Sequence, residues 1–339
     1  MNFAHNLINL SELKNYNQII NHYYPEILKI VKNTINNKNI KIRTKISDFT
    51  GLSLVNKSYD KNEEISQKEN YIYDGISQKE KDKVENYGNR IQIEVVSVVP
   101  FEIKNIIDRL DIEIFKLILR YKTLKKVKAE LEKESSNLLS EKYISNDDIL
   151  RNSHSIRETI EYYDFLINLV NETNIKQEIE KLKFHLLGSF NPLENKVYIN
   201  WFGILLASIF YEGSVEDFTI MSLIHELSHA YTKIGFDKDG NHWINETFEN
   251  SDIKIKEGFA QQYCELIIES NFEELMKLFI DFSINESRLY IEYRTWFDAK
   301  EKHKVEKVRS LLIQTRTQQI TSYNEFIILL ENTKKYYKK

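Results

Sequence analysis

Residues 214–235 read SVEDFTIMSLIHELSHAYTKIG, and this stretch decides the fold. Ser214 is a suitable N-cap, and the acidic residues Glu216 and Asp217 in the first turn complement the helix dipole. Gly235 is a natural helix end. Between these ends, apolar residues fall on nearly every side of the predicted helix, which is typical of a helix buried in a protein core. The sequence therefore predicts one buried α-helix that carries polar groups inside it.

The polar groups of this helix have the spacing of a metal site. His225 and His229 are four residues apart, so both imidazoles lie on one face of a helix that repeats every 3.6 residues. Two such nitrogens can reach one Zn²⁺ at about 2.0–2.1 Å, and Glu226 can act as a general base beside the metal. A chance match would usually lie on a solvated helix face. Inside a buried helix these groups need partners, and a metal ion meets that need.

The motif does not by itself fix the third ligand. A metzincin-type site would continue with a glycine and a histidine where this chain has Thr232 and Gly235, so that class is excluded. The remaining candidates lie downstream and are His242, Glu246, Glu249, Asp252 and Glu257.

Glu257 is the preferred third ligand, because an apolar helix is predicted to follow it. Gly258 costs about 1 kcal/mol in a helix interior, so its presence beside Ala260 predicts close packing against another backbone, such as that of the metal-bearing helix. The alternative is an ordinary glutamate paired with a neighbouring lysine, Lys254 or Lys256. The other acidic candidates are interpreted as loop or capping residues, with Glu246 the best rival, and His242 as a loop histidine.

The two motifs in combination resemble those of a known group of enzymes. His225-Glu226-x-x-His229 followed by Glu257-Gly258-x-Ala260 is similar to the gluzincin branch of the zinc metallopeptidases, and collagenase-like members share this wording. The resemblance covers about residues 180–270. It implies a zincin-like domain in which His225, His229 and Glu257 bind Zn²⁺ and Glu226 is general base and acid. Thermolysin-like members have an aspartate where this chain has Gln261, whose amide oxygen is a weaker acceptor for a ligand histidine.

The same resemblance implies a group that stabilises the oxyanion of the tetrahedral intermediate. Gluzincins commonly supply a downstream tyrosine or histidine for this role. Tyr290 and Tyr293 are the catalytic candidates here, with His303 behind them. In a chain with twenty tyrosines, the alternative for either residue is packing in the core or on the surface.

A hairpin is predicted directly before the motif-bearing helix. Residues 183–190 and 196–201 flank the turn-rich segment 191–195, and residues 197–201 favour a strand. In peptidases of this type an edge strand ahead of the active helix binds extended substrate by backbone pairing. The alternative is a simple core strand. Residues 202–211 are predicted to form a short apolar helix under the site.

Patterns elsewhere define four regions of a helix-rich α+β protein with a small mixed or antiparallel sheet. The predicted regions are a mixed N-terminal region at 1–100 with a polar loop at about 60–89, long amphipathic helices at 101–175, a zincin-like catalytic core at 176–270 and a helical C-terminal subdomain at 271–339. The N-terminal region is predicted to hold a helix at 15–33, a strand within 40–55 and a strand at 90–99. One long helix from 103 to 138 is expected to pack within the chain, the alternative being a coiled-coil contact. Further helices are expected at 146–171, 272–283, 285–297, 299–316 and 321–336.

Composition excludes several classes of function. The net charge of −4 gives no basic footprint for nucleic acid. The single cysteine, Cys264, excludes an internal disulfide and is interpreted as a buried structural thiol. No signal peptide is evident, and the longest apolar stretch, 197–211, is too short to cross a bilayer, so a cytoplasmic location without membrane contact is expected, although non-classical export would leave no mark in the sequence.

These observations lead to one expected function and two alternatives. The expected function is zinc-dependent hydrolysis of a peptide bond in a peptide or protein substrate, with Glu226 as general base. The first alternative is a catalytically silent zincin-like protein that docks a partner through its long helix. The presence of Glu226 disfavours it, because a purely structural site needs no base. The second alternative is a metal hydrolase that acts on a non-peptide amide. Oligomeric state has no signal in the sequence.

Overall fold

The computed structural model describes residues 16–54, 91–138, 146–283, 292–298 and 302–337. It is helix-rich and contains one three-stranded mixed sheet, so the α+β class is confirmed. The predicted polar loop at about 60–89 and Tyr290 lie outside the described residues.

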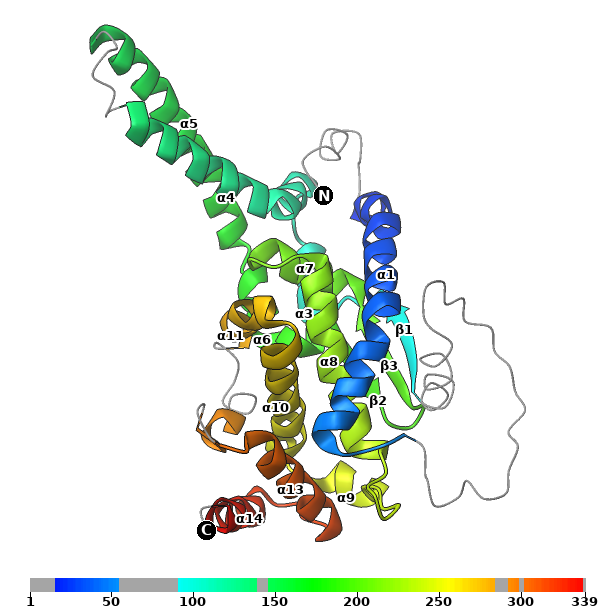
Figure 1. The fold of residues 1–339 in the computed structure, drawn as a ribbon. Helices are drawn as coiled ribbons and strands as arrows, with labels where there is room; N and C mark the ends of the chain where they lie inside the picture. Colours follow the sequence, from blue (N-terminus) through cyan, green and yellow to red (C-terminus); the bar gives the residue numbers. More distant parts are fainter. Residues whose placement is uncertain (1–15, 55–90, 139–145, 284–291, 299–301, 338–339) are drawn as a thin grey trace.

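Helix α8 (Val215–Ile234) forms the centre of the fold and is buried along nearly its whole length. The side chain of Ser214 accepts a hydrogen bond from the backbone N–H of Asp217, and the Asp217 side chain accepts one from the backbone N–H of Ser214. This capping box fixes where the helix begins. Helices α1 (Tyr16–Thr50) and α10 (Ile253–Asn271) pack against α8 (Figure 1). The prediction of a buried helix is therefore confirmed.

The sheet has the strand order β1-β3-β2, and it lies against α8 through β2 and β3. Strand β3 (Lys196–Asn200) pairs in parallel with β1 (Gln92–Val96) and antiparallel with β2 (Gly188–Asn191). The predicted hairpin is confirmed, but β3 is the central strand, and β2 is one of the two edge strands. The first arm is also shorter than predicted, because residues 183–187 belong to helix α6 (Ile175–Leu187).

The N-terminal region differs from the prediction at one point. Helix α1 continues to Thr50, so the predicted strand within 40–55 is wrong, apart from an isolated bridge between Ser53 and Phe236. Ile35, Ile42 and Ile46 are buried at spacings of seven and four residues, which is a helical period. The predicted strand at 90–99 is confirmed as β1.

The long amphipathic stretch forms two helices instead of one. Helix α3 (Phe101–Ile107) ends before Asp111, whose side chain accepts the backbone N–H of Glu113 and starts α4 (Ile112–Leu138). Helix α4 packs against α5 (Asn146–Glu172) and, near its start, against α7 (Trp201–Phe210), which confirms packing within the chain. The far ends of α4 and α5 project from the body as a helical hairpin (Figure 1).

The C-terminal part wraps the end of α10 that carries Glu257 and builds a second hydrophobic core. The elements that contribute to this second core are α9 (Asn245–Asn250), η3 (Glu292–Thr295), α13 (Lys304–Thr317) and α14 (Tyr323–Tyr336). The elements η2 (Glu273–Leu275) and α11 (Met276–Ser283) contribute to the main hydrophobic core instead. Of the helix predicted at 285–297, residues 292–295 form a short 3₁₀ turn, and residues 284–291 lie outside the described part of the chain.

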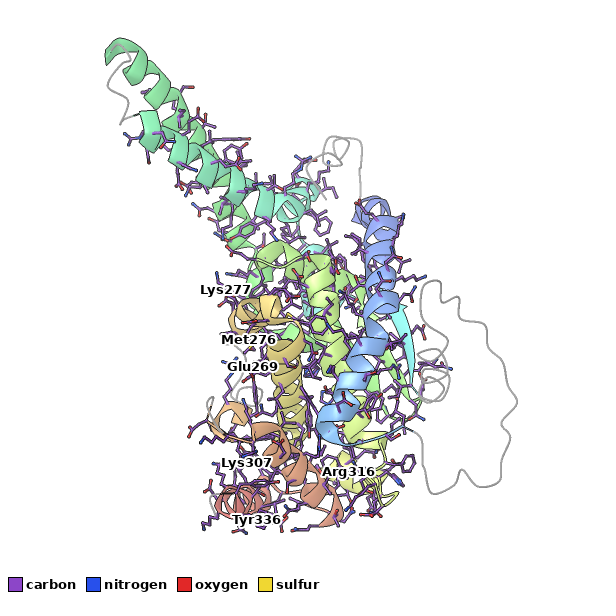
Figure 2. The ribbon with its side chains drawn as sticks, viewed as in Figure 1. Glu269, Met276, Lys277, Lys307, Arg316 and Tyr336 are labelled. Atoms are coloured by element: carbon purple, nitrogen blue, oxygen red, sulfur yellow. The ribbon has the colours of Figure 1, made fainter. Side chains whose placement is uncertain are left out.

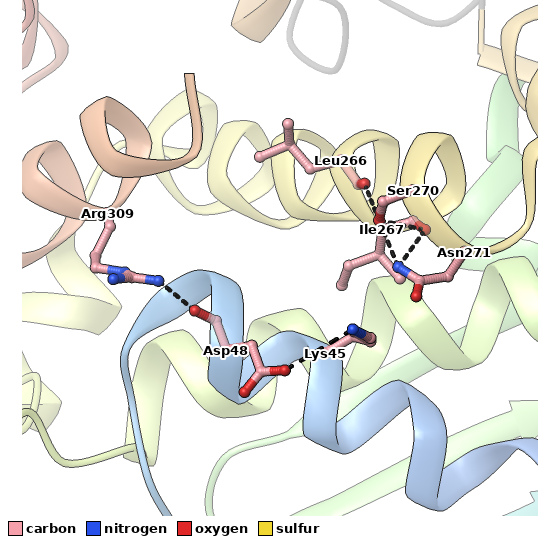
Figure 3. Close-up of polar contacts among 7 residues, drawn as sticks. All are labelled: Lys45, Asp48, Leu266, Ile267, Ser270, Asn271 and Arg309. Carbon is pink, nitrogen blue, oxygen red and sulfur yellow. Dashed lines mark hydrogen bonds and ion pairs between the residues drawn. The ribbon is translucent and has the colours of Figure 1, made fainter. Parts of the chain in front are cut away.

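Basic side chains from one element bind the carbonyl ends of others. Arg309 of α13 donates to the carbonyls of Asp48 and Phe49 at the end of α1, where Asp48 also pairs with Lys45 at 4.0 Å (Figure 3). Arg316, on the same helix and labelled in Figure 2, donates to the carbonyl of Gly235 at 2.5 Å and so closes the end of α8. Cations are favourable at helix C-termini, so these two arginines of α13 stabilise the C-terminal ends of α1 and α8.

Two further sequence predictions concern Cys264 and membrane spans. Cys264 is buried on α10, with its sulfur 3.9 Å from the carbonyl oxygen of Met221, in agreement with a structural thiol. None of the helices in the described ranges combines the length and apolar character needed to cross a bilayer.

Candidate metal centre

Three side-chain atoms converge between α8 and α10. Nε2 of His225 and Nε2 of His229 are 3.2 Å apart, and Oε2 of Glu257 lies 3.4 Å and 3.2 Å from them respectively. Donors held at about 2.0–2.1 Å from a tetrahedral Zn²⁺ are separated by about 3.3 Å, so these three atoms match one face of such a tetrahedron. All three side chains are almost fully buried. In the described residues, this is the one group of histidine, cysteine and carboxylate side chains with metal-ligand spacing.

Glu257 comes from the second helix, as predicted. Asp252 caps that helix by accepting the backbone N–H of Lys254 at 2.9 Å. The alternative pairing of Glu257 with a lysine is not made: Lys254 pairs with Glu292, and Lys256 donates to the carbonyl of Glu249. The rival candidates lie elsewhere on the surface, because Glu246, Glu249 and His242 are exposed.

Gly258 has a different role from the predicted one. A Cβ at this position would lie 2.3 Å from ring atoms of Trp296, so the glycine makes room for an indole and not for the backbone of α8. Trp296 is fully buried in the second hydrophobic core. The sequence identified the close approach correctly but not the partner.

The pKa shifts of His225 and Glu257 favour metal binding, whereas that of His229 favours its protonated form. Burial lowers the pKa of His225 to about 4, against the opposing effect of Glu257. Burial alone would raise the pKa of Glu257, but the two imidazoles outweigh it and hold this pKa well below the ordinary range. Burial likewise lowers the pKa of His229, but Glu257 and Glu226 outweigh it and the net shift is upward. A neutral imidazole and an ionised carboxylate are the forms that bind a metal.

Glu226 lies beside the three donors and is not one of them. It is 3% exposed, and burial raises its pKa to about 8. Strand β2 lies close to the Glu226 side chain at Gly188. A Cβ on Gly188 would lie 3.0 Å from Cγ of Glu226 and 2.7 Å from Oγ of Ser222. The glycine therefore lets the edge strand approach the helix at the carboxyl group.

His225 is held by an aromatic residue that sequence reasoning missed. The ring of Phe184 stacks on its imidazole with centroids 4.5 Å apart and planes 24° apart. Nδ1 of His225 is buried and has no hydrogen-bond partner among the described residues, so the expected acceptor Gln261 does not support this ring. Phe184 follows a break in α6 at Lys183 (φ 37°), and nothing in the sequence marks that break.

The oxyanion candidates are only partly described. Tyr293 is buried on η3, where its hydroxyl donates to Glu265 at 2.7 Å and accepts from Nε of Arg294 at 3.2 Å. These contacts agree with the alternative, a packing role. The predicted catalytic role gains no support from them and stays a prediction. His303 is exposed at the start of α13.

Comparison with protein families, with curated proteins and with solved structures finds no match to this chain. The site is therefore interpreted from its own geometry.

Proposed function

We propose that this chain is a zincin-like, gluzincin-type metallopeptidase that binds one Zn²⁺ and hydrolyses peptide bonds. The observation that carries the proposal is the triangle of Nε2, Nε2 and Oε2 with sides of 3.2, 3.2 and 3.4 Å. A carboxyl group that is not a ligand, Glu226, accompanies this triangle. A structural zinc site usually takes four protein ligands, whereas a catalytic site takes three and leaves one position open.

The chemistry divides between the metal and the chain. A Zn²⁺ bound here would supply Lewis acidity that lowers the pKa of water to about 7. Glu226 would accept a proton from the attacking water and return it to the leaving amine. Its raised pKa suits a group that must hold a proton for part of the cycle, and a nearby cation would draw that pKa down toward the operating pH.

Substrate would bind along β2. This strand is an edge of the three-stranded sheet, and its outer side pairs with no other strand in the described part of the chain. An extended peptide can add to such an edge through backbone hydrogen bonds. Because Gly188 brings β2 against Glu226, a peptide paired there would place a carbonyl group near the metal ligands.

The test is cleavage of a mixed peptide library by the purified protein. We expect cleavage that a chelator abolishes and Zn²⁺ restores. Glu226→Gln should keep its zinc and lose about 10²–10⁴-fold in rate, the usual contribution of a general acid–base group. Cleavage of non-peptide amides without cleavage of any peptide would move the function to the broader class of metal amidohydrolases.

A second candidate function is partner docking through the α4–α5 hairpin. This hairpin projects from the body (Figure 1), and Tyr162 and Phe165 on α5 are 59% and 57% exposed. Exposed aromatic residues are common at protein interfaces. If docking is the function, replacing both residues by serine abolishes complex formation. In the metallopeptidase we propose, the same replacement leaves peptide cleavage unchanged.

A further inference from the structure

The imidazole ring of His225 is oriented by aromatic packing and not by a hydrogen bond to Nδ1 from any of the described residues. A histidine that binds a metal usually donates its second ring N–H to a carboxylate, carbonyl or water, which fixes the plane of the ring. Nδ1 of His225 is buried without such a partner among the described residues. Its Nε2 nevertheless points at the other two donors, at 3.2 Å and 3.4 Å. Among the described residues, contacts other than a hydrogen bond to Nδ1 therefore hold the plane of the ring.

Aromatic rings enclose His225 from two directions. Phe184, itself 2% exposed, stacks on the imidazole at 4.5 Å, and the ring of His229 meets it edge-on at 4.7 Å and 88°. A flat ring at stacking distance restricts rotation of the imidazole, because rotation would drive the imidazole edge into the phenyl face. The stack therefore fixes the plane of the ring, and within that plane the contacts of Nε2 with His229 and Glu257 favour the edge that faces them.

Phe184 is in turn fixed from the opposite side. Lys183 has φ 37° and ψ −112°, a conformation that a residue with a side chain adopts rarely and that persists only where the surroundings impose it. The Lys183 ammonium donates to the carbonyl of Phe282 at the end of α11 and lies 5.5 Å from the Phe282 ring centroid. The Phe282 ring packs edge-on against Phe184 at 5.3 Å. This chain of contacts ties α11 to the imidazole.

We propose that Phe184 is the positioning residue of the metal centre and that its ring, held by Lys183 and Phe282, fixes the plane of the His225 imidazole, whose Nδ1 has no hydrogen-bond partner among the described residues. The inference rests on the proposed function, since it requires His225 to bind a metal.

The test measures Zn²⁺ affinity of the full chain by competition with a chromogenic chelator. Phe184→Leu removes the flat face and keeps an apolar side chain. We expect its affinity to fall about 10- to 100-fold, the range found when a ligand histidine loses its outer support. The Co²⁺-substituted protein should also show altered ligand-field bands, because these bands report coordination geometry.

Phe279→Leu is the matched control. Phe279 is also fully buried, and its ring lies 6.2 Å from that of Phe184 in the same aromatic cluster. The Phe279→Leu variant should lower the melting temperature as Phe184→Leu does, yet its Zn²⁺ affinity should stay within about twofold of the parent. Phe184→Tyr keeps the ring and should keep most of the affinity. Phe184→Met, which better conserves volume, replaces the leucine variant if that variant does not fold.

Three results would overturn the inference. The first is parental Zn²⁺ affinity in the leucine or methionine variant. The second is an equal loss of affinity in Phe279→Leu, which would reduce Phe184 to an ordinary core residue. The third is a parent protein that binds no Zn²⁺, which would remove the proposed function as well. Parental affinity in the Phe184 variants, with Zn²⁺ bound to the parent, would remove this inference alone.

Discussion

Glu257 and Glu246 are both glutamates downstream of the histidine pair, but only one faces it. Oε2 of Glu257 lies 3.2 Å from Nε2 of His229, whereas Glu246 is exposed on α9. Glu257→Ala would leave two protein ligands. We therefore expect it to weaken Zn²⁺ binding by more than the roughly 100-fold that marks the upper end for outer partners, and Glu246→Ala to leave binding nearly unchanged. Chelator competition on both variants measures this, and the opposite ranking would move the ligand to Glu246.

Gly188 is the residue that sets the distance between the edge strand and Glu226. An added Cβ would lie 2.7 Å from both Oγ of Ser222 and the carbonyl oxygen of Tyr198. Gly188→Ala should destabilise the protein by about 1–3 kcal/mol through overpacking. It should also lower the rate of peptide cleavage more than the control variant does, because the added methyl group forces β2 away from α8. Gly240→Ala is the control, since Gly240 has φ 83° in a loop and strains the backbone without touching Glu226. Urea titration and peptide turnover of the two variants decide the point; parental cleavage by Gly188→Ala would refute it.

The site residues that the sequence predicted are those whose positions depend on spacing along a single helix or on the start of a helix. His225 and His229 follow from the period of one helix, and Glu257 from the start of the next apolar segment. Phe184 could not be found this way, because its contact with His225 depends on a left-handed backbone at Lys183, a residue type that gives no signal for it. The partner of Gly258 was likewise hidden, since Trp296 comes from a distant turn.

Among the elements, α13 supplies the arginines that bind the carbonyl ends of α1 and α8. Arg316 is 3% exposed and donates to the carbonyls of Gly235 at 2.5 Å and Asn241 at 3.1 Å, so it closes the end of α8. Lys41 of α1 similarly donates to the carbonyl of Asn271 at the end of α10. With nine glycines in 339 residues, several helix ends of this chain are closed by cations from neighbouring elements and not by local glycine turns.

Arg316→Met should therefore destabilise the fold by about 1.5–3 kcal/mol for each charged hydrogen bond that it removes. Lys334→Met is the comparison, since it removes an ion pair with Glu331 that lies on the surface within one helix and should cost about 0–1 kcal/mol. Urea unfolding followed by circular dichroism measures both changes. Equal and small changes in the two variants would show that the end of α8 needs no cation.

The elements that sequence periodicity identified are those with one strong pattern. Helix α8 and helix α5 were predicted nearly to their ends, whereas strand β1 spans only residues 92–96 of the predicted 90–99. The strand expected within 40–55 is helical, because the isoleucines there serve the long helix α1. The continuous helix from 103 to 138 is broken because Asp111 starts a new helix, a capping signal that the apolar spacing concealed.

For the whole molecule, the Zn²⁺ that we propose would join helices α8 and α10. His225 and His229 belong to α8, and Glu257 belongs to α10, so bound Zn²⁺ should stabilise the folded state over the unfolded chain. At free Zn²⁺ about 1,000-fold above Kd, the gain is about 4 kcal/mol, and removal of the metal by a chelator should lower Tm by several degrees. Calorimetry checks this, with Glu257→Ala as the control that a chelator should not affect. An unchanged Tm of the parent would contradict it.

At this scale, the fold class was predictable and the strand order was not. The parallel pairing of β1 with β3 joins segments about a hundred residues apart, and no local signal marks it. The choice between central and edge strand followed from that pairing, which is why we propose β2 and not residues 197–201 as the strand that binds substrate. The projection of the α4–α5 hairpin could not be predicted either, because an amphipathic pattern does not indicate which part of a helix packs against the rest of the fold.

The central claim is that this chain holds one zinc ion on two imidazoles and one carboxylate. Elemental analysis of the purified protein, before and after chelation and reloading, tests it most directly. We expect about one Zn²⁺ per parent chain, the same content in Glu226→Gln, and loss of the metal in His225→Ala. A folded parent protein that carries no zinc and takes none up after chelation would contradict the account.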